Sequence, residues 1–284
     1  MNKEIKEYLD NKDHLSNSEI NTYLDCQTKW YQQYVKGNRE YNIHFDFGIM
    51  GHKVLETRQK PNKELTDFDK FTEAFKIEDF DLYFDSIFKE LDELLEGYEI
   101  IDREITFNIE GIKGIIDLLL YDKEKDEYIV YDYKFSNSFR TVDDILLDQQ
   151  LYIYGAAVSI LKNIDINKIR VGYITIPKRP INNPTILSSG KLSKSKSQNT
   201  TYDAYINKIN ELGLNIEDYE DFLIELKNKT ILKRVETKIN NDFLVRVLKN
   251  IELVKKDMRK GYILENWNSY KCKTCPMKDI CKKN

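Results

Sequence analysis

The hydrophobic and polar positions of the chain follow a helical period at both ends and a strand-like period in the middle. Apolar residues recur at helical spacing over 16–36, where Ser16 and Glu19 fit a capping box in which each side chain bonds the other residue's amide. A second helix is predicted from about Phe47 to Gln59, and one or two more are predicted over 64–98.

The middle of the chain predicts a small antiparallel meander. Apolar runs at strand spacing cover 104–109, 112–121 and 128–135, separated by the turn Glu110-Gly111 and by a polar turn at 122–126. A helix over 142–161 and a strand over 169–176 are expected to follow. This mixture of strands and helices predicts the α/β fold class.

The C-terminal part shows a weaker pattern. Residues 177–201 are rich in Pro, Asn, Ser and Lys and are predicted to form an exposed, mobile loop. Helices are expected around 202–228 and 240–261, before a basic tail with three cysteines. We interpret residues 1–284 as a single domain, with its core at about 47–176 and a variable loop and helices at about 177–233.

One predicted strand carries a carboxylate within an apolar run. Asp117 interrupts residues 115–120, and burying an ionised carboxylate is unfavourable unless it pairs with a buried cation or binds a metal. On the next strand, Asp132 and Lys134 are two residues apart and share a face. If the strands pair, the carboxylates can bind Mg²⁺ or Mn²⁺, with the lysine beside a metal-bound water and a phosphate.

Asp117, followed after fourteen residues by Asp132-Tyr133-Lys134, resembles the motif of the PD-(D/E)XK nuclease superfamily. That family often has proline before the first aspartate, and Ile116 stands there instead, a departure tolerated in its RecB-like branch. The resemblance implies a restriction-endonuclease-like core, a mixed central sheet flanked by helices. It also implies metal-dependent hydrolysis of DNA, with Asp117, Asp132 and Lys134 as catalytic residues. We expect the carbonyl of Tyr133 to join the metal ligands.

Two further motifs resemble the RecB-like branch. Gly48-Ile49-Met50-Gly51-His52 is similar to a helix that brings a histidine to the metal, which implies that His52 is a ligand and that the glycines permit close backbone approach. Gln150 and Tyr154 are similar to its QxxxY motif and share one helix face. They are implied to orient the catalytic groups and to contact DNA. Glu104 begins a strand and is expected to be solvated, the alternative being that it approaches the metal.

All four cysteines fit one metal site: they are Cys26, Cys272, Cys275 and Cys281. In a reducing cytosol such clustering favours a metal over disulfides. Four thiolates suit either zinc or an iron–sulfur cluster, and spacing does not separate the two. The layout resembles the iron–sulfur exonucleases of the same branch, including the CRISPR-associated adaptation nuclease and the AddB nuclease domain. This resemblance implies a [4Fe–4S] cluster, held in an iron–sulfur clasp formed by 16–36 and 262–284.

Composition narrows the class of protein without naming a partner. The net charge of −4 is not typical of a general nucleic-acid binder, but basic residues gather in the 177–201 loop and in the tail. We expect DNA contacts there, from Lys191, Lys194, Lys196, Lys271 and Lys273. The sequence has no secretory signal and no apolar run of about 18 residues, so a cytoplasmic protein with no membrane contact is expected.

These features together predict a metal-dependent deoxyribonuclease. We expect a single-stranded DNA exonuclease in recombination, repair or phage DNA processing, working in a bacterial cell or a phage-infected host, with a helicase or recombination protein as partner. One alternative is a nuclease that trims CRISPR spacers or cuts flapped or branched DNA. Another is a non-catalytic iron–sulfur module that binds DNA or a helicase. The absence of a GxxxxGK[ST] loop indicates that the chain does not itself hydrolyse ATP.

Overall fold

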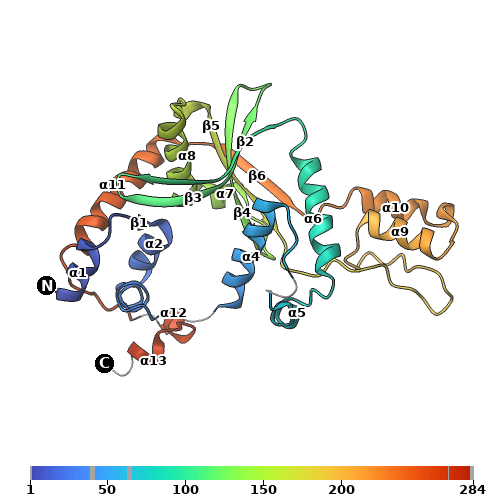
Figure 1. Cartoon of the computed structure of the whole chain (residues 1–284), viewed down its shortest axis with the longest axis horizontal. Coiled ribbons are helices and arrows are strands. Elements are labelled where there is room, and N and C mark those ends of the chain that lie inside the picture. Colours follow the sequence, from blue (N-terminus) through green and yellow to red (C-terminus); the bar gives the residue numbers. More distant parts are fainter. Residues whose placement is uncertain (1, 39–41, 63–65, 268, 282–284) are drawn as a thin grey trace.

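The computed structural model describes residues 2–38, 42–62, 66–267 and 269–281, and a six-stranded mixed sheet lies at the centre of this part (Figure 1). The strands run in the order β1-β3-β4-β5-β6, with β2 paired to the other edge of β3. Strands β2, β3 and β4 form the predicted antiparallel meander, and β4 runs parallel to β5. The bounds are β1 (Leu15–Ser16), β2 (Glu99–Ile109), β3 (Ile112–Asp122), β4 (Glu127–Phe135), β5 (Ile169–Ile176) and β6 (Lys233–Lys238).

Helices cover both faces of the sheet and bury a core on each. The first core is formed with α4 (Ile43–Thr57), α5 (Phe68–Phe75) and α6 (Phe80–Leu94), and the second with α2 (Asn17–Asp25), α8 (Gln149–Lys162) and α11 (Asn241–Met258). Successive residues of β4 alternate between them: Tyr131 and Tyr133 face the first core, and Val130 faces the second. The expectation of an α/β fold with a mixed sheet flanked by helices is confirmed.

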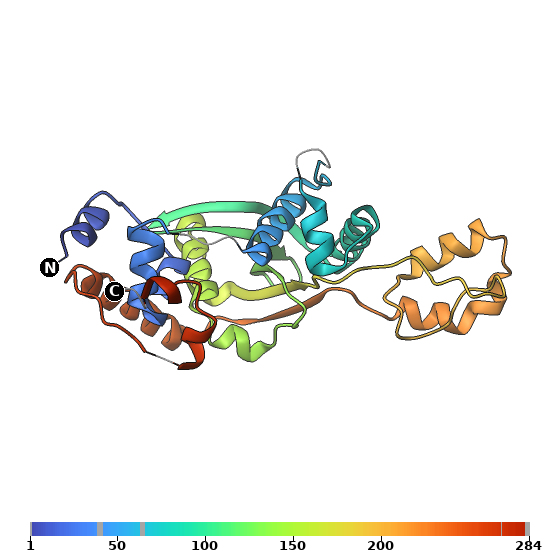
Figure 2. The ribbon, with the colours of Figure 1, turned by 90° about the horizontal axis from the view of Figure 1, so that it is seen from below.

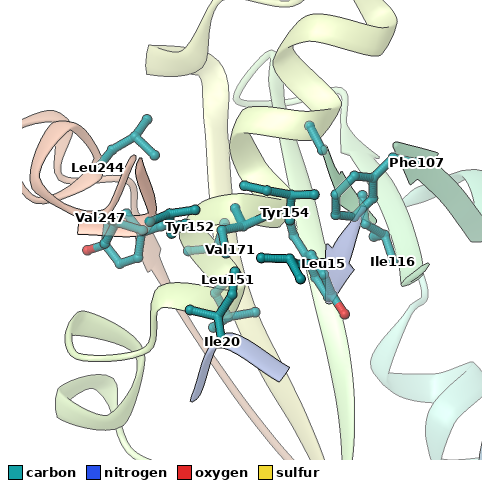
Figure 3. Close-up of a cluster of buried hydrophobic side chains, with 14 of the residues drawn as sticks. Leu15, Ile20, Phe107, Ile116, Leu151, Tyr152, Tyr154, Val171, Leu244 and Val247 are labelled. Carbon is teal, nitrogen blue, oxygen red and sulfur yellow. The ribbon is translucent and has the colours of Figure 1, made fainter. Parts of the chain in front are cut away.

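Helix α8 packs closely against the second face of the sheet. Figure 3 shows Leu151 and Tyr154 of this helix in one cluster with Ile116 of β3 and Val171 of β5. Each of these side chains is at most 7% exposed. The helix is therefore held rigidly, and its N-terminal turn has a fixed position relative to the strands.

The predicted helix over 16–36 is wrong as a single element. Helix α2 ends at Asp25, the backbone of Cys26 is extended, and α3 (Gln27–Trp30) and a π-helical turn (Tyr31–Val35) follow. Ser16 caps α2 as expected, accepting from the amide of Glu19. The Glu19 carboxylate is instead fully buried and bonds other side chains, namely Tyr8, Lys12 and Trp30.

Two other predictions in the C-terminal half need correction. The helix over 142–161 is divided into α7 (Val142–Leu146) and α8, because Asp148 adopts an extended conformation and caps α8. Strand β6 was not predicted. Its sequence KRVETK has too few apolar residues to show a period, because it lies at the end of the sheet order, with one neighbouring strand, and needs little apolar surface.

Residues 177–232 form an arm that projects from the body beyond α6 (Figures 1 and 2). Helices α9 (Tyr202–Glu211) and α10 (Glu220–Lys227) share a small core with Leu192. Residues Ile186 and Leu192 form a β-bridge. Most of 177–201 is exposed and lacks helix or strand, as predicted for a loop, although buried side chains such as Leu192 anchor it to the arm.

The two ends of the described chain lie on the same side of the molecule. Figures 1 and 2 show α12 (Ser269–Lys273) and α13 (Lys278–Cys281) beside α2, with α1 (Lys3–Asp10) close by. Within the described ranges, no helix combines the length and the apolar character that crossing a membrane requires.

Candidate active site

Asp117 lies at a gap along one edge of β3. Strand β4 pairs with β3 from Leu118 onward, and β1 pairs with Ile112 and Lys113. Both use the same edge, because β2 lies along the opposite one. The Asp117 carboxylate faces this gap, and its Oδ2 accepts a hydrogen bond of 2.6 Å from the backbone amide of Tyr133. The carboxylate thus takes the place of a main-chain acceptor where the two strands separate.

Glu104 and His52 approach Asp117 from two other elements, β2 and α4. One ligand atom from each of the three residues lies within 4.8 Å of the others, and His52 Nδ1 is 3.3 Å from Asp117 Oδ1. Glu104 is opposite Asp117 in the register of β2 and β3, and its φ of 51° is left-handed. Such a conformation is strained for glutamate, and strain of this kind concentrates at functional sites.

The position of His52 depends on Gly51, the residue before it. A Cβ at Gly51 would lie 2.2 Å from the ring of Phe135 on β4, so only glycine lets α4 pack this closely on the sheet. The Phe135 ring in turn lies edge-on to the His52 imidazole, with centroids 5.8 Å apart. The expected close approach is found at Gly51 but not at Gly48, where a Cβ would meet no atom within 4 Å.

Asp132 and Lys134 lie on the face of β4 that α8 covers, as their spacing predicts. Lys134 Nζ is 2.8 Å from Asp132 Oδ2. The Gln150 amide links both, because its Nε2 donates to Asp132 Oδ1 over 2.9 Å and its Oε1 accepts from Lys134 Nζ over 3.2 Å. The same Nε2 also donates to the Tyr154 hydroxyl over 2.7 Å. Asp132, Lys134, Gln150 and Tyr154 therefore form one hydrogen-bonded group, while Asp117 groups with His52 and Glu104.

Burial and charge both shift the protonation of these residues. Burial raises the pKa of Asp132, and Asp117 adds to this rise against the opposing effect of Lys134. Burial, with Asp117, raises the pKa of Glu104 to about 7. Burial acts to lower the pKa of Lys134 and of His52, but Asp132 and Asp117 respectively outweigh it, so both pKa values are raised. Carboxylates that repel one another in this way favour a cation between them.

The residues present fit a hard divalent cation. His52, Glu104 and Asp117 line a cavity of about 430 Å³ and offer one nitrogen and two carboxylate groups. The Tyr133 carbonyl points to the same edge of β4 as its amide, which bonds Asp117. Glu104 is the residue whose place the sequence did not predict, since a glutamate near a strand start is usually solvated. The sequence held one indication of its place: in a hairpin that turns at Glu110-Gly111, Glu104 falls opposite Asp117.

The four cysteines lie together at the ends of the chain. They line one cavity of about 110 Å³ and form no disulfide. Cys26 precedes α3, and its sulfur accepts from the amide of Lys29 at 3.5 Å. Among the described residues, no three of the four sulfur atoms are found within 4.8 Å of one another.

The basic residues expected to contact DNA do not line the carboxylate cavity. Lys191, Lys194 and Lys196 belong to the arm formed by residues 177–232, where Lys194 bonds the carbonyl of Asp218 and Lys196 pairs with Glu225. In the tail, Lys271 pairs with Asp25, and Lys273 is exposed. Their contribution to DNA binding stays a prediction.

Comparisons with known proteins identify the family of this chain. A crystal structure described as a candidate exonuclease from Eubacterium rectale is 13% identical, with a TM-score of 0.37 and 95% of this chain and 96% of that chain covered. The solved structure of SSO0001 is 14% identical, with a TM-score of 0.26 and 83% and 95% covered. No curated protein matches the chain. The model of the PD-(D/E)XK nuclease superfamily matches residues 14–282, so the chain belongs to that superfamily.

Proposed function

We propose that this nuclease is a deoxyribonuclease that uses Mg²⁺ or Mn²⁺ and digests single-stranded DNA from an end. The observation that carries the proposal is the single group formed by Asp132, Lys134 and Gln150, beside a cavity lined by His52 and Asp117. Phosphodiester hydrolysis by the superfamily needs carboxylates for a cation and a lysine for the phosphate, and this chain presents both.

The residues of the candidate active site have three different tasks in this proposal. Asp117, Asp132, Glu104 and His52 would hold the cation, which supplies an activated water and offsets charge on the phosphate when bound. Lys134 orients the attacking water and stabilises negative charge on the phosphate oxygens. Gln150 keeps Lys134 and Asp132 aligned by bonding both. It therefore acts as a positioning residue.

We further propose that the four cysteines bind a [4Fe–4S] cluster, so that residues 16–36 and 262–284 act as the clasp. The shared cavity and the amide bond to the Cys26 sulfur support a metal site. A single tetrahedral zinc, with Zn–S bonds of about 2.3 Å, requires sulfur atoms about 3.8 Å apart. The choice of a cluster over zinc rests on the resemblance of the cysteine layout to iron–sulfur exonucleases, and metal analysis of the purified protein separates the two.

The test is degradation of end-labelled single-stranded DNA by the full chain, with Mn²⁺ and with EDTA. We expect metal-dependent cleavage that Asp132→Ala and Lys134→Ala each reduce by roughly a thousandfold or more. Asp126→Ala and Lys168→Ala are matched controls, since they remove an exposed ion pair elsewhere. An inert wild type, or unchanged rates in the two active-site variants, would refute the proposal.

Circular single-stranded DNA separates end digestion from internal cutting. An exonuclease leaves the closed circle intact and degrades the same molecule once it is linearised. Cleavage of the circle, or preferential cutting of flapped and branched substrates, would instead assign the endonuclease alternative.

A further inference from the structure

Exposed apolar side chains surround the carboxylate cavity. Phe45 is 65% exposed, Ile49 is 56% exposed and Ile115 is 46% exposed. All three line the cavity that His52 and Asp117 also line. Large apolar groups left in water beside a catalytic site are unfavourable unless a ligand covers them.

Regular geometry explains why these residues accompany the ligands. Phe45, Ile49 and His52 occupy positions i, i+4 and i+7 of α4, so they project from one face of the helix. Ile115 and Asp117 are two residues apart on β3 and share a face of the strand. The apolar wall and the ligand set are therefore fixed to one another by rigid elements.

The cavity has open space at Gly48, between Phe45 and Ile49 on α4, where a flat ligand would fit. Gly48 lines the same cavity, and a Cβ at this position would meet no atom within 4 Å. Apart from its two chain neighbours and the backbone of α4, no atom therefore lies within 4 Å of that position.

The carboxylates of the cavity disfavour any further phosphate that the cation does not neutralise. The carboxylates of Glu56, Glu104 and Asp117 line it, and Lys53 is paired with Glu56 over 2.6 Å. An unneutralised phosphate would be repelled here, whereas the uncharged face of a nucleobase would not. A phosphate bound by the cation places its attached nucleoside within reach of the same cavity.

We propose that Phe45 and Ile49, with Ile115, form a subsite for an unpaired base next to the phosphate that is cut. This inference rests on the proposed function and adds the side chains that would recognise a single strand. In a duplex both faces of a base are covered by stacking, so only a base in a single strand, or one extruded from a helix, presents a face to this wall. Stacking on an aromatic ring tolerates any base sequence, so the subsite selects strand state rather than sequence.

The test measures binding rather than cleavage. Fluorescence anisotropy of the full chain, with Ca²⁺ in place of Mg²⁺, compares oligothymidine with an abasic strand of equal length and with a blunt duplex. We expect the wild type to prefer oligothymidine over the abasic strand by about tenfold. Phe45→Ala should abolish this preference and leave binding of the abasic strand unchanged, and Phe45→Trp should restore it. Ile160→Ala is the matched control, because Ile160 is 61% exposed on the opposite end of α8 from Gln150.

Each outcome bears on the inference separately from the proposed function. A wild type that binds the abasic strand or the blunt duplex as tightly as oligothymidine overturns the subsite. So does a Phe45→Ala variant that keeps the preference or weakens all three ligands equally. The wild type could cut no DNA and still prefer oligothymidine, with this preference lost in the Phe45→Ala variant. In that case the subsite stands and the proposed reaction fails.

Discussion

Gln150 Nε2 lies 2.9 Å from Asp132 Oδ1 and donates a hydrogen bond to it, joining the first turn of α8 to the middle of β4. Since the same side chain accepts from Lys134, one residue orients both a carboxylate and an ammonium group. Core packing of α8 holds Gln150 in place (Figure 3).

Gln150→Ala is expected to lower the rate of DNA cleavage about 10- to 100-fold without unfolding the protein, because Asp132 and Lys134 lose their common partner. Initial rates and circular dichroism check this. The control is Gln149→Ala, which removes bonds to Asn17 and Asn21 on α2 but none to the site. Equal losses in the two variants would assign Gln150 a structural role only.

Glu104→Gln should raise the Mn²⁺ concentration needed for half-maximal cleavage about tenfold, because an anionic ligand becomes neutral. A metal titration of initial rates measures this. Glu99→Gln, on the same strand, changes only an exposed pair with Lys123 and should leave the titration unchanged. If Glu104→Gln titrates like the wild type, Glu104 is not a ligand.

Gly51→Ala and Gly48→Ala should change stability in opposite directions. A Cβ at residue 51 overlaps the Phe135 ring, and such overpacking costs about 1–3 kcal/mol of the free energy of unfolding. A Cβ at residue 48 has open space, and replacing glycine in a helix stabilises it by about 0.5–1 kcal/mol. Thermal unfolding of the wild type and both variants tests this. A Gly51→Ala variant as stable as the wild type would contradict the close packing of α4 on Phe135.

Asp257→Asn is expected to destabilise the fold at neutral pH by about 1 kcal/mol, because Asp257 accepts from Lys260 and from Tyr23, across 234 residues. Lys260 first, and then Tyr23, hold the pKa of Asp257 below its usual value. The stabilisation is therefore present above the unfolded-state pKa of about 3.9 and is lost as the pH falls through the lower folded-state value. The melting temperatures of the two proteins should converge as the pH falls below the folded-state pKa of Asp257; a constant difference would rule out this carboxylate as the cause.

If the four cysteines bind the proposed cluster, Cys275→Ser should yield protein with less iron, weaker visible absorption and a lower melting temperature, because the cluster would no longer join the two ends of the chain. Metal analysis and calorimetry after anaerobic purification test this. If metal analysis finds zinc and no iron in the wild type, the four cysteines form a zinc site and the cluster proposal is wrong. An iron-free variant with unchanged melting would leave the cluster without a structural role.

The local sequence determined the central strands and much of the candidate catalytic group. Period-two spacing placed Asp132 and Lys134 on one face of β4, and a polar residue within an apolar run identified Asp117. Gln150 and Tyr154 shared a helix face for the same kind of reason. These relationships join residues close in the chain, so the regular periods of the helix and the strand are enough to fix them.

Tertiary structure decided what depends on contacts between distant segments. Glu104 reaches Asp117 only because β2 pairs with β3, where the backbone of Glu104 is left-handed. Cys26, where the predicted helix over 16–36 breaks, meets the three C-terminal cysteines at one cavity only in the folded chain. Strand β6 has almost no pattern of its own and exists because β5 offers it an edge. Phe45 showed nothing special as an exposed aromatic residue in the sequence. It became a candidate base subsite only when the fold placed it beside the ligands, because proximity in space is set by packing and not by spacing.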